Sequence, residues 1–471
     1  MDTKALRQKI LDLAIHGKLV PQDPNDEPAS VLLERIRAEK ERLIKEGKIK
    51  KGKKSAKTSD KPHYPFELPK GWVWTTIEDV CSKIGSGSTP KGSNYSKEGI
   101  PFFRSQNVYN SGIVMSDIKY ISDEIHQMMI GTEVVANDLL LNITGGSLGR
   151  CAVIPSNFEK GNVSQHVCIL RPIVIKPEFL HCFILSSFFA KSMKITGSGR
   201  EGLPKYNLEK MLLPLPPEQE QERIVAETKR LQSFVDELET SCENMTKLVA
   251  QVKSKVLDLA IHGKLVPQDP NDEPASELLK RINPKAEIIT DNGHYQKLPV
   301  GWCVCHINEI SESLLGKTLD RTKDNGEFKR YVCAVNVQWG YFDFTTQKKF
   351  RIEAKDFERY AVKKGDLLIC EGGDVGRCAI WDTDTEMYYQ NALHRVRCKF
   401  GISEKYLQYS LWHFKLNGVI DSLCKGVTIK HFTQSTMNKL EIPLPPFAEQ
   451  QRIVAKIEEL FLQLDIIEES L

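Results

Sequence analysis

Apolar residues recur every three or four positions along the middle of the chain. From Ile224 to Leu259 the steps alternate strictly between four and three residues, the spacing of a left-handed coiled-coil seam. The PLPP segment at 214–217 must halt whatever precedes it. The pattern therefore predicts a long helix over residues 218–262, and Gly263 is suited to end it.

The same pattern returns, cut in two, at the ends of the chain. A second PLPP at 443–446 precedes the same apolar steps over residues 447–471, and Leu6, Ile10 and Leu13 continue the series over residues 1–16. Gly17 matches Gly263. We expect these two pieces together to match the central helix in length and to pack antiparallel against it.

Two stretches of about 140 residues, 68–208 and 298–439, alternate short apolar runs with glycine turns. Three segments are typical of strands and two are typical of helices. The expected strands are 71–80, 167–175 and 331–337, and the expected helices are 178–194 and 404–423. Each stretch is therefore predicted to fold as an α+β body.

Repeats tie these parts together. The twenty residues LDLAIHGKLVPQDPNDEPAS occur at 11–30 and again at 257–276 without a single difference. The segments LPKGW and LPVGW, and the segments PLPPEQEQERIV and PLPPFAEQQRIV, also recur at a distance of about 230 residues. This period is too long for a solenoid, so the chain is a duplicated half. The simplest geometry is pseudo-two-fold, with the termini close together.

The polar part of the twenty-residue repeat predicts a loop followed by a short helix. Ser30 and Ser276 are the expected N-caps of the two copies of that helix.

Composition narrows the class of protein. The 471 residues are 41% hydrophobic and 27% charged, with no apolar run of about 20 residues and no signal peptide at the start. The twelve cysteines lack metal-binding spacing, so we expect reduced, structural thiols and a cytoplasmic protein. The net charge of +3 hides a basic stretch at 37–61, with 11 Lys/Arg and 4 Asp/Glu. We interpret that stretch as a low-complexity tether that could add phosphate contacts.

Polar and basic loops recur at equivalent points of the two bodies. Arg, Lys, Asn and Gln hydrogen-bond base edges, and Ser and Thr suit phosphates, so these loops are candidates for DNA binding. The candidates are Ser88, Thr89, Lys91, Asn94, Arg104, Gln106, Asn107, Arg200, Lys205 and Asn207 in the first body, and Lys317, Arg321, Asn336, Gln338, Lys425, Thr428, Lys430 and His431 in the second.

Catalytic motifs are missing. The sequence has no phosphate-binding loop, no Asp/Asn-Pro-Pro-aromatic tetrad for adenine methylation and no nuclease cluster. His166 and His394 have no evident nucleophile partner, so they are expected to be packed or hydrogen-bonding residues. We expect no catalytic, cofactor-binding or metal-binding residues in this chain.

The chain has two variable bodies that each follow LP.GW and each close with PLPP..EQ.RIV, and a long helix and A..GKL come after them. This arrangement resembles the specificity subunit of Type I restriction-modification systems. The resemblance implies two pseudo-two-fold-related α/β target recognition domains separated by a pair of long antiparallel coiled-coil helices. The implied segments are 1–36 (helical), 37–63 (basic linker), 64–208 (first recognition domain), 209–285 (central helical region), 286–439 (second recognition domain) and 440–471 (C-terminal helix).

The resemblance also implies the function. Each domain would read one half of a split double-stranded DNA target, and the helices would set the spacing between the half-sites. The chain would hold two methyltransferase subunits and, through them, restriction subunits. S-adenosylmethionine, ATP and magnesium would belong to those partners. The expected methyltransferase contacts are Glu220, Gln221, Arg223, Glu449, Gln450, Arg452, His16, Lys18, His262 and Lys264.

Two other functions stay open on the sequence alone. One is a coiled-coil adaptor that binds proteins rather than DNA. The other is a stand-alone DNA-modifying enzyme with degenerate motifs. The exact identity of the twenty-residue repeats also leaves two accounts open: a shared contact surface for two identical partners, or near-identical coding sequence that permits recombination between reading domains.

Overall fold

The structure is a computed structural model that describes residues 2–49, 64–90, 92, 94–196, 202–289, 298–319, 326–424 and 431–471. The chain divides into two compact units, Met1–Ser241 (unit 1) and Cys242–Leu471 (unit 2). One helix, α8 (Glu218–Ile261), carries the chain from unit 1 into unit 2. Within these ranges, no helix is long and apolar enough to cross a lipid bilayer.

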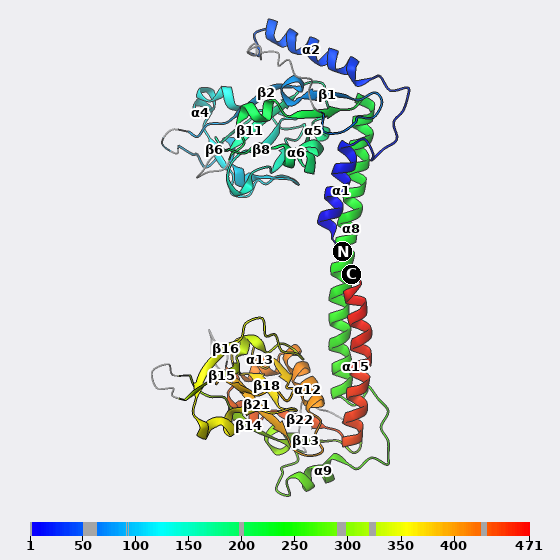
Figure 1. Cartoon of the computed structure of the whole chain (residues 1–471), viewed down its shortest axis with the longest axis vertical. Coiled ribbons are helices and arrows are strands. Elements are labelled where there is room, and N and C mark those ends of the chain that lie inside the picture. The colour runs from blue at the N-terminus through cyan, green and yellow to red at the C-terminus, as the bar shows by residue number, and fades with distance from the viewer. Residues whose placement is uncertain are drawn as a thin grey trace. The chain divides into compact units, whose positions relative to one another are not determined.

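Unit 1 is built from short strands and helices that precede α8 (Figure 1). Its sheets, in strand order, are β1 (Val73–Thr76) with β12 (Leu212–Leu215); β6 (Lys119–Ile121), β3 (Ile100–Phe103), β10 (Gly161–Val163) and β7 (Glu133–Val134); β2 (Cys81–Ser86), β11 (Val167–Pro172), β8 (Leu139–Asn142) and β9 (Cys151–Val153); and β4 (Val108–Tyr109) with β5 (Gly112–Ile113). Its helices are α1 (Thr3–Ile15), α2 (Ala29–Lys45), α3 (Ile77–Val80), α4 (Asp123–Met128), α5 (Pro177–Ile184), α6 (Ser187–Ser192) and α7 (Lys205–Glu209).

Unit 2 repeats this plan after α8. Its sheets are β13 (Cys303–His306) with β22 (Glu441–Leu444); β16 (Lys348–Ile352), β15 (Glu327–Val332), β20 (Met387–Tyr389) and β17 (Ala361–Val362); and β14 (Ser311–Leu315), β21 (Leu393–Cys398), β18 (Leu367–Cys370) and β19 (Cys378–Ile380). Its helices are α9 (Ala275–Ile282), α10 (Ile307–Ile310), α11 (Phe357–Tyr360), α12 (Glu404–Leu416), α13 (Val419–Leu423), α14 (Gln434–Asn438) and α15 (Phe447–Glu469).

The two units share one sheet topology although their sequences have diverged. Strand order β2-β11-β8-β9 in unit 1 matches β14-β21-β18-β19 in unit 2, and β6-β3-β10-β7 matches β16-β15-β20-β17. In both units only the central pair of the second sheet is parallel, β3 with β10 and β15 with β20. The duplication predicted from the repeats therefore extends to the mixed helix and strand content of both bodies.

Within each unit, a terminal helix lies along α8 (Figure 1). In unit 1, Arg7 of α1 forms ion pairs with Asp236 and Glu239 of α8, at 2.6 and 2.8 Å. In unit 2, Lys253 of α8 forms ion pairs with Asp465 and Glu468 of α15, at 2.6 and 2.9 Å. The predicted seam is buried unevenly: Ile224, Val235, Val249 and Val256 are buried, whereas Met245 and Val252 are exposed.

The predicted helix ends were right at the glycines and wrong at the serines. Gly17 and Gly263 end their helices with φ of +64° and +63°, and a Cβ at either position would lie 2.3 Å from Pro69 or Pro299. The helices at the ends of the repeats begin two residues earlier than predicted, with Pro28 and Pro274 as N-caps in place of Ser30 and Ser276. A side-chain cap is not needed because Gly71 and Gly301 accept the Ala29 and Ala275 N–H groups.

Four of the predicted elements are interrupted. The strand expected over 71–80 ends at Thr76, and α3 follows it. The helix expected over 178–194 splits into α5 and α6, because Ser186 accepts a hydrogen bond from the Phe189 N–H and starts a new helix. The helix expected over 404–423 breaks at Gly418, whose φ is +73°. The strand expected over 331–337 ends at Val332, and a 3-10 helix follows it.

In each unit an ion pair on one four-stranded sheet also contacts the segment that follows an edge strand of the other four-stranded sheet. In unit 1 the Asp138 carboxylate accepts two hydrogen bonds from Arg171, both of 2.8 Å, and a third from the Val135 N–H. Burial lowers the pKa of Arg171, but the hydrogen bonds and charge of Asp138 outweigh this and raise the pKa above its usual value. Asp366 and Arg397 make the same pair in unit 2, at 2.7 Å.

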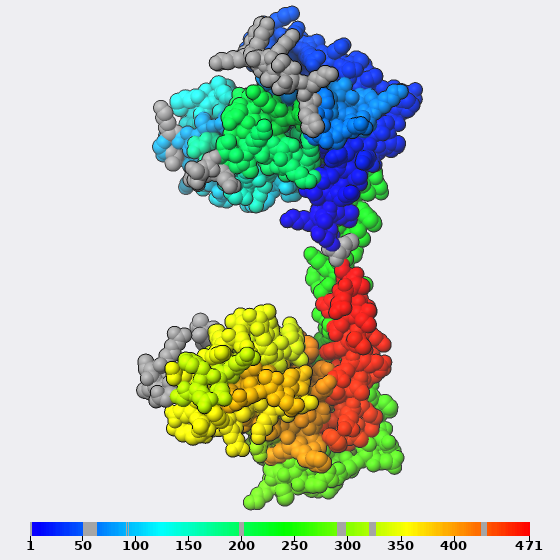
Figure 2. Space-filling view, in the orientation of Figure 1, coloured from blue at the N-terminus to red at the C-terminus, as the bar shows by residue number. Residues whose placement is uncertain are grey.

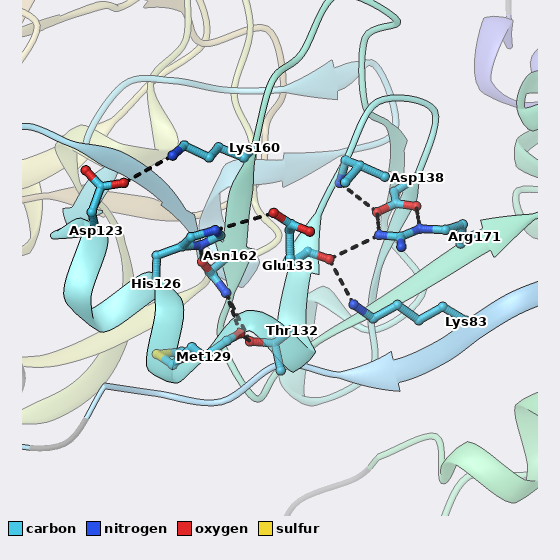
Figure 3. A network of polar contacts seen from close by, with 11 residues as sticks. Lys83, Asp123, His126, Met129, Thr132, Glu133, Asp138, Lys160, Asn162 and Arg171 are labelled. Atoms are coloured by element: carbon cyan, nitrogen blue, oxygen red, sulfur yellow. Dashed lines mark hydrogen bonds and ion pairs between the residues drawn. The ribbon is translucent and has the colours of Figure 1, made fainter. Parts of the chain in front are cut away.

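Unit 1 surrounds this pair with a polar network that unit 2 lacks at the matching strand position (Figure 3). The Asn162 amide oxygen on β10 accepts a hydrogen bond from Nδ1 of His126 on α4, and the amide nitrogen donates to the Met129 carbonyl and the Thr132 hydroxyl. The matching residue on β20 is Tyr388, whose hydroxyl donates to Glu386. The same backbone therefore supports different interiors in the two units.

Candidate nucleic-acid interface and repeated motif cluster

The predicted loops are numbered in chain order: the first holds the candidates of 88–94 and 317–321, the second those of 104–107 and 336–338, and the third those of 200–207 and 425–431. The first loop begins at the same place in each unit, directly after β2 and after β14. The Ser88 N–H donates to the Val163 carbonyl, and the Lys317 N–H donates to the Tyr389 carbonyl, which holds the matching position. The glycines just before these residues permit the close approach: a Cβ on Gly87 would lie 1.9 Å from the Val163 oxygen. Ser88, Thr89 and Asn94 are exposed, and Lys317 is half-buried.

The second loop corrects two predictions. Asn107 and Asn336 end equivalent 3-10 helices, η2 (Ser105–Asn107) and η5 (Ala334–Asn336), and both side chains are buried. Each amide donates to two backbone carbonyls of its own loop and accepts a hydrogen bond from a backbone N–H. With their donors and acceptors used inside the fold, these two asparagines shape the loops and do not read bases.

Other residues of the second loop remain accessible. Arg104 donates to the carbonyl and carboxylate of Asp117, at 2.6 and 3.2 Å. Gln106 is exposed and donates to the same carboxylate at 2.7 Å. The hydrogen bond from Arg104 and its positive charge hold the pKa of Asp117 below its usual value. In unit 2, Gln338 is half-buried and donates to the Val335 carbonyl.

In unit 1 the three loops converge at one end of the sheets. Thr89 of the first loop donates to Gln165, in the turn between β10 and β11. The next residue, His166, contacts the Thr144 hydroxyl at 2.8 Å through Nδ1, and Thr144 pairs with Gly202 of the third loop. The Ser105 carbonyl of the second loop accepts from Asn142 at the end of β8. His166 is therefore a hydrogen-bonding residue, as predicted.

Unit 2 assembles its loops in the same way. The Lys317 carbonyl accepts from the Asn391 N–H, and the Glu371 N–H donates to the Ala392 carbonyl. The Phe432 N–H, beside the exposed His431, donates to the Glu371 carbonyl. Arg377 joins the second loop to this end by donating to the Ala334 carbonyl. His394 is fully buried and contacts the Phe432 carbonyl at 2.8 Å, so it is a packed histidine, as predicted.

The remaining candidates fall into two groups. In the third loop of unit 1, Lys205 is exposed with an ion pair to Glu209, and Asn207 donates to the Lys194 carbonyl. Lys91, Arg200, Arg321, Lys425, Thr428 and Lys430 lie outside the described residues. The turn residues Gln165, His166 and Asn391 were not among the candidates, because only their contacts to the other loops reveal that they belong to this end.

The repeated motifs meet around one buried carboxylate in each unit. In unit 1 Glu220 accepts hydrogen bonds from the Trp72 indole at 2.9 Å and from Gln22 at 3.0 Å. In unit 2 Glu449 accepts from Trp302 and Gln268, both at 3.0 Å. Burial raises the pKa of Glu220, and these hydrogen bonds act in the opposite direction.

Neighbouring residues of the same motifs complete this cluster. Arg223 pairs with Asp26 at 2.5 Å, and Arg452 pairs with Asp272 at 2.6 Å. Both arginines have a pKa held above the usual value, first by the hydrogen bond to the aspartate. The loop of each repeat is therefore tied to the start of a long helix by a carboxylate and an ion pair. The cluster explains why LP.GW, the twenty-residue repeat and EQ.R recur together.

This geometry corrects four predicted methyltransferase contacts. Glu220, Gln221, Glu449 and Gln450 are all buried. Gln221 and Gln450 accept hydrogen bonds from the Lys176 and Ser403 N–H groups and donate to proline carbonyls. Their side chains hold the cluster together and offer no surface to a partner. His16, His262, Arg223 and Arg452 are half-buried, whereas Lys18 and Lys264 are exposed.

Replacing Glu220 with glutamine should lower the free energy of unfolding of unit 1 by about 1–3 kcal/mol, because one of two buried donors loses its acceptor. Glu449→Gln should have the same effect on unit 2. Urea denaturation of the full chain measures both. Glu222→Gln, whose carboxylate is 59% exposed and pairs with Lys176, is the matched control and should change stability by less than about 1 kcal/mol. Equal effects at Glu220 and Glu222 would contradict the buried-carboxylate account.

Comparison with known proteins decides the family. Residues 69–245 and 299–471 match the family described as Type I restriction modification DNA specificity domain. The chain belongs to this family. It is similar to the Type I restriction enzyme EcoAI specificity subunit of Escherichia coli, at 29% identity over 97% of this chain and 88% of that protein. The EcoEI specificity subunit of Escherichia coli is 28% identical, over 99% and 90% of the two chains.

A solved structure supports the fold. The HsdS subunit from Thermoanaerobacter tengcongensis superposes with a TM-score of 0.55 at 19% identity, over 86% of this chain and 93% of that chain. The family match and the two relatives make the chain a Type I specificity subunit, a DNA-recognition component rather than a catalytic one. The two matched segments coincide with the bodies and the helices that follow them, so both halves of the duplication belong to the family.

Proposed function

We propose that each unit of this specificity subunit reads one half of a split double-stranded DNA target through its own loop cluster. The observation that carries this proposal is the contrast between scaffold and loops. The two units share strand order and loop positions, yet the side chains at the loops differ, as at Ser88 and Lys317. Identical frames with different polar loops are suited to two different base sequences.

The spacing of the two half-sites is assigned to the helices. We infer that α8, paired with α1 in unit 1 and with α15 in unit 2, acts as a coiled-coil spacer that brings the termini close together. Support comes from the continuity of α8 over Glu218–Ile261 and from the ion pairs of Arg7 and Lys253 within their units. A rigid spacer is what a bipartite target requires, because the two half-sites lie at a fixed separation along the DNA.

Two identical methyltransferase subunits are the proposed protein partners. The twenty-residue repeats have the same exposure in both units except at Ser30 and Ser276, and the exposed residues of the loop, from Pro21 to Asn25 and from Pro267 to Asn271, are identical. The fold alone does not require identity at exposed positions. Along α15, which lies uncovered in Figure 2, Leu462 and Ile466 are 63% and 59% exposed, as expected for a helix that binds a partner.

The chemistry is assigned to those partners. Methyltransferase subunits would carry S-adenosylmethionine and restriction subunits would use ATP and magnesium, while this chain supplies the DNA specificity in the cytoplasm of a bacterium or archaeon. The target adenine would then leave the duplex for the methyltransferase pocket.

Mapping of methylated adenines tests the two-reader proposal. The chain is expressed with its methyltransferase subunits, and the methylated motif is compared with that of His431→Ala, in unit 2, and Gln106→Ala, in unit 1. Each variant should relax one half-site, by about 1–3 kcal/mol of discrimination at a contacted base pair, and leave the other half-site unchanged. A continuous motif, or relaxation of the same half-site by both variants, would contradict the proposal.

Charge reversal of the exposed lysines tests the partner proposal. Lys18→Glu and Lys264→Glu alter equivalent exposed positions in the two repeats. Each single variant should retain one methyltransferase subunit per chain, and the double variant should retain none, because each repeat holds one copy. Native mass spectrometry counts the subunits. Two bound subunits in every variant would show that the repeats are not the docking surface.

A further inference from the structure

The outer face of β15 and β16 in unit 2 carries cations where a sheet ordinarily avoids them. Arg330 lies directly opposite Lys349, and Phe328 lies directly opposite Arg351. Like charges at directly opposed positions destabilise an antiparallel pair. All four side chains are exposed, and Phe328 is 63% exposed. We call these four residues the β15–β16 strip.

The cations of the strip have no acidic partner among the residues that the structure describes. The Arg351 guanidinium lies 4.5 Å from the centre of the Phe328 ring and donates to the Gly326 carbonyl. Arg330 borders a cavity of about 470 Å³ that Asp382 also lines, but no ion pair joins them. The acidic residues Glu327 and Glu386 neutralise Lys329, which alternates to the opposite face. The strip therefore presents an uncompensated positive charge.

Unit 1 does not repeat this feature. Matched through the parallel strand pairs β15–β20 and β3–β10, Arg330 corresponds to Pro101 and Lys349 corresponds to Tyr120. The cations are thus not a requirement of the shared fold, which tolerates neutral residues at the same cross-strand position.

The strip is continuous with the loop cluster of unit 2. The Val332 carbonyl, two residues beyond Arg330 on β15, accepts from the Gln390 N–H, in the turn that also holds the first loop. Alternate residues of a strand are about 7 Å apart, which is comparable to the distance between successive phosphates of one DNA strand. A basic strand with an exposed aromatic ring fits a sugar–phosphate backbone.

We propose that the β15–β16 strip binds the phosphate backbone of double-stranded DNA beside the half-site that unit 2 reads. Arg330, Lys349 and Arg351 contact phosphates, and Phe328 holds the Arg351 guanidinium in place. Unit 2 then contributes a larger sequence-independent part of the DNA affinity than unit 1. This inference rests on the proposed function for its position along the target, but not for its affinity for DNA.

Salt dependence of DNA binding tests the strip. The full chain in complex with its methyltransferase subunits, carrying Arg330→Gln, Lys349→Gln and Arg351→Gln together, is titrated onto a duplex with the target and a duplex without it. The slope of log affinity against log salt should become less steep by about 2 to 3 on both duplexes, since each phosphate contact contributes about 0.9. The methylated motif should stay the same.

A second triple variant separates contact from net charge. Lys355→Gln, Lys363→Gln and Lys364→Gln remove the same charge from other exposed positions of unit 2 and should change the slope by less than 1. An unchanged slope in the strip variant, or equal changes in the two triple variants, would overturn the proposal. Loss of target preference by the wild-type complex would instead count against the proposed function, because the slope on the duplex without the target is measured independently.

Discussion

Replacing Asp138 with alanine should destabilise unit 1 by about 3–5 kcal/mol. The Asp138 side chain is fully buried and accepts three hydrogen bonds, two from Arg171 and one from the Val135 N–H. Its removal leaves the Arg171 guanidinium, which is 31% exposed, without its counter-ion. Urea denaturation of the full chain measures the loss of unfolding free energy. Proteolysis of unit 1 in the same urea series shows that the loss belongs to this unit.

Two further variants serve as controls for this prediction. Asp366→Ala removes the matching carboxylate and should destabilise unit 2 to a similar extent, since Asp366 is 1% exposed and pairs with Arg397. Asp123→Ala removes a carboxylate of the same polar network whose ion pair with Lys160 is exposed, and it should cost less than about 1 kcal/mol. Similar losses for Asp138→Ala and Asp123→Ala would show that the buried pair stabilises unit 1 no more than the exposed pair does.

The elements that could be predicted from sequence are those set by local patterns. The apolar steps after PLPP predicted a helix to residue 262, and α8 ends at Ile261. Gly17 and Gly263 end their helices because the residue after the helix takes a left-handed backbone conformation, which glycine adopts without strain. The duplication was equally visible, since identical segments of sequence need no structure to be recognised.

Predictions that depended on distant partners were less successful. The local sequence predicts Ser30 as an N-cap. In the fold, the Gly71 carbonyl accepts the Ala29 N–H, so the helix begins at Ala29 instead. Asn107 has the side chain of a base reader, but its amide is used by carbonyls of its own loop. Glu220 belongs to a polar helix start, and only its contact with Trp72, 148 residues earlier, shows that it is buried. In each case a tertiary contact decided the role, and the residue type alone did not.

Lengthening α8 by seven residues should move the two half-sites apart without changing either of them. A copy of residues 235–241 inserted between Ser241 and Cys242 adds about 10 Å and turns the helix by nearly two whole turns, so each unit keeps its face. The contacts of Arg7 to Glu239 and of Lys253 to Asp465 stay within their own units. The spacer between the two half-sites should grow by about 2 to 3 base pairs, and methylation of the original target should be lost.

Mapping of methylated adenines in cells that express this insertion with the methyltransferase subunits is the most direct test of two readers joined by a helical spacer. The same seven residues inserted between Gly52 and Lys53, outside α8, serve as the control and should leave the motif unaltered. Two unchanged half-sites separated by a longer spacer are the predicted result. An unchanged spacer, or a change of base sequence in either half-site, would contradict the account.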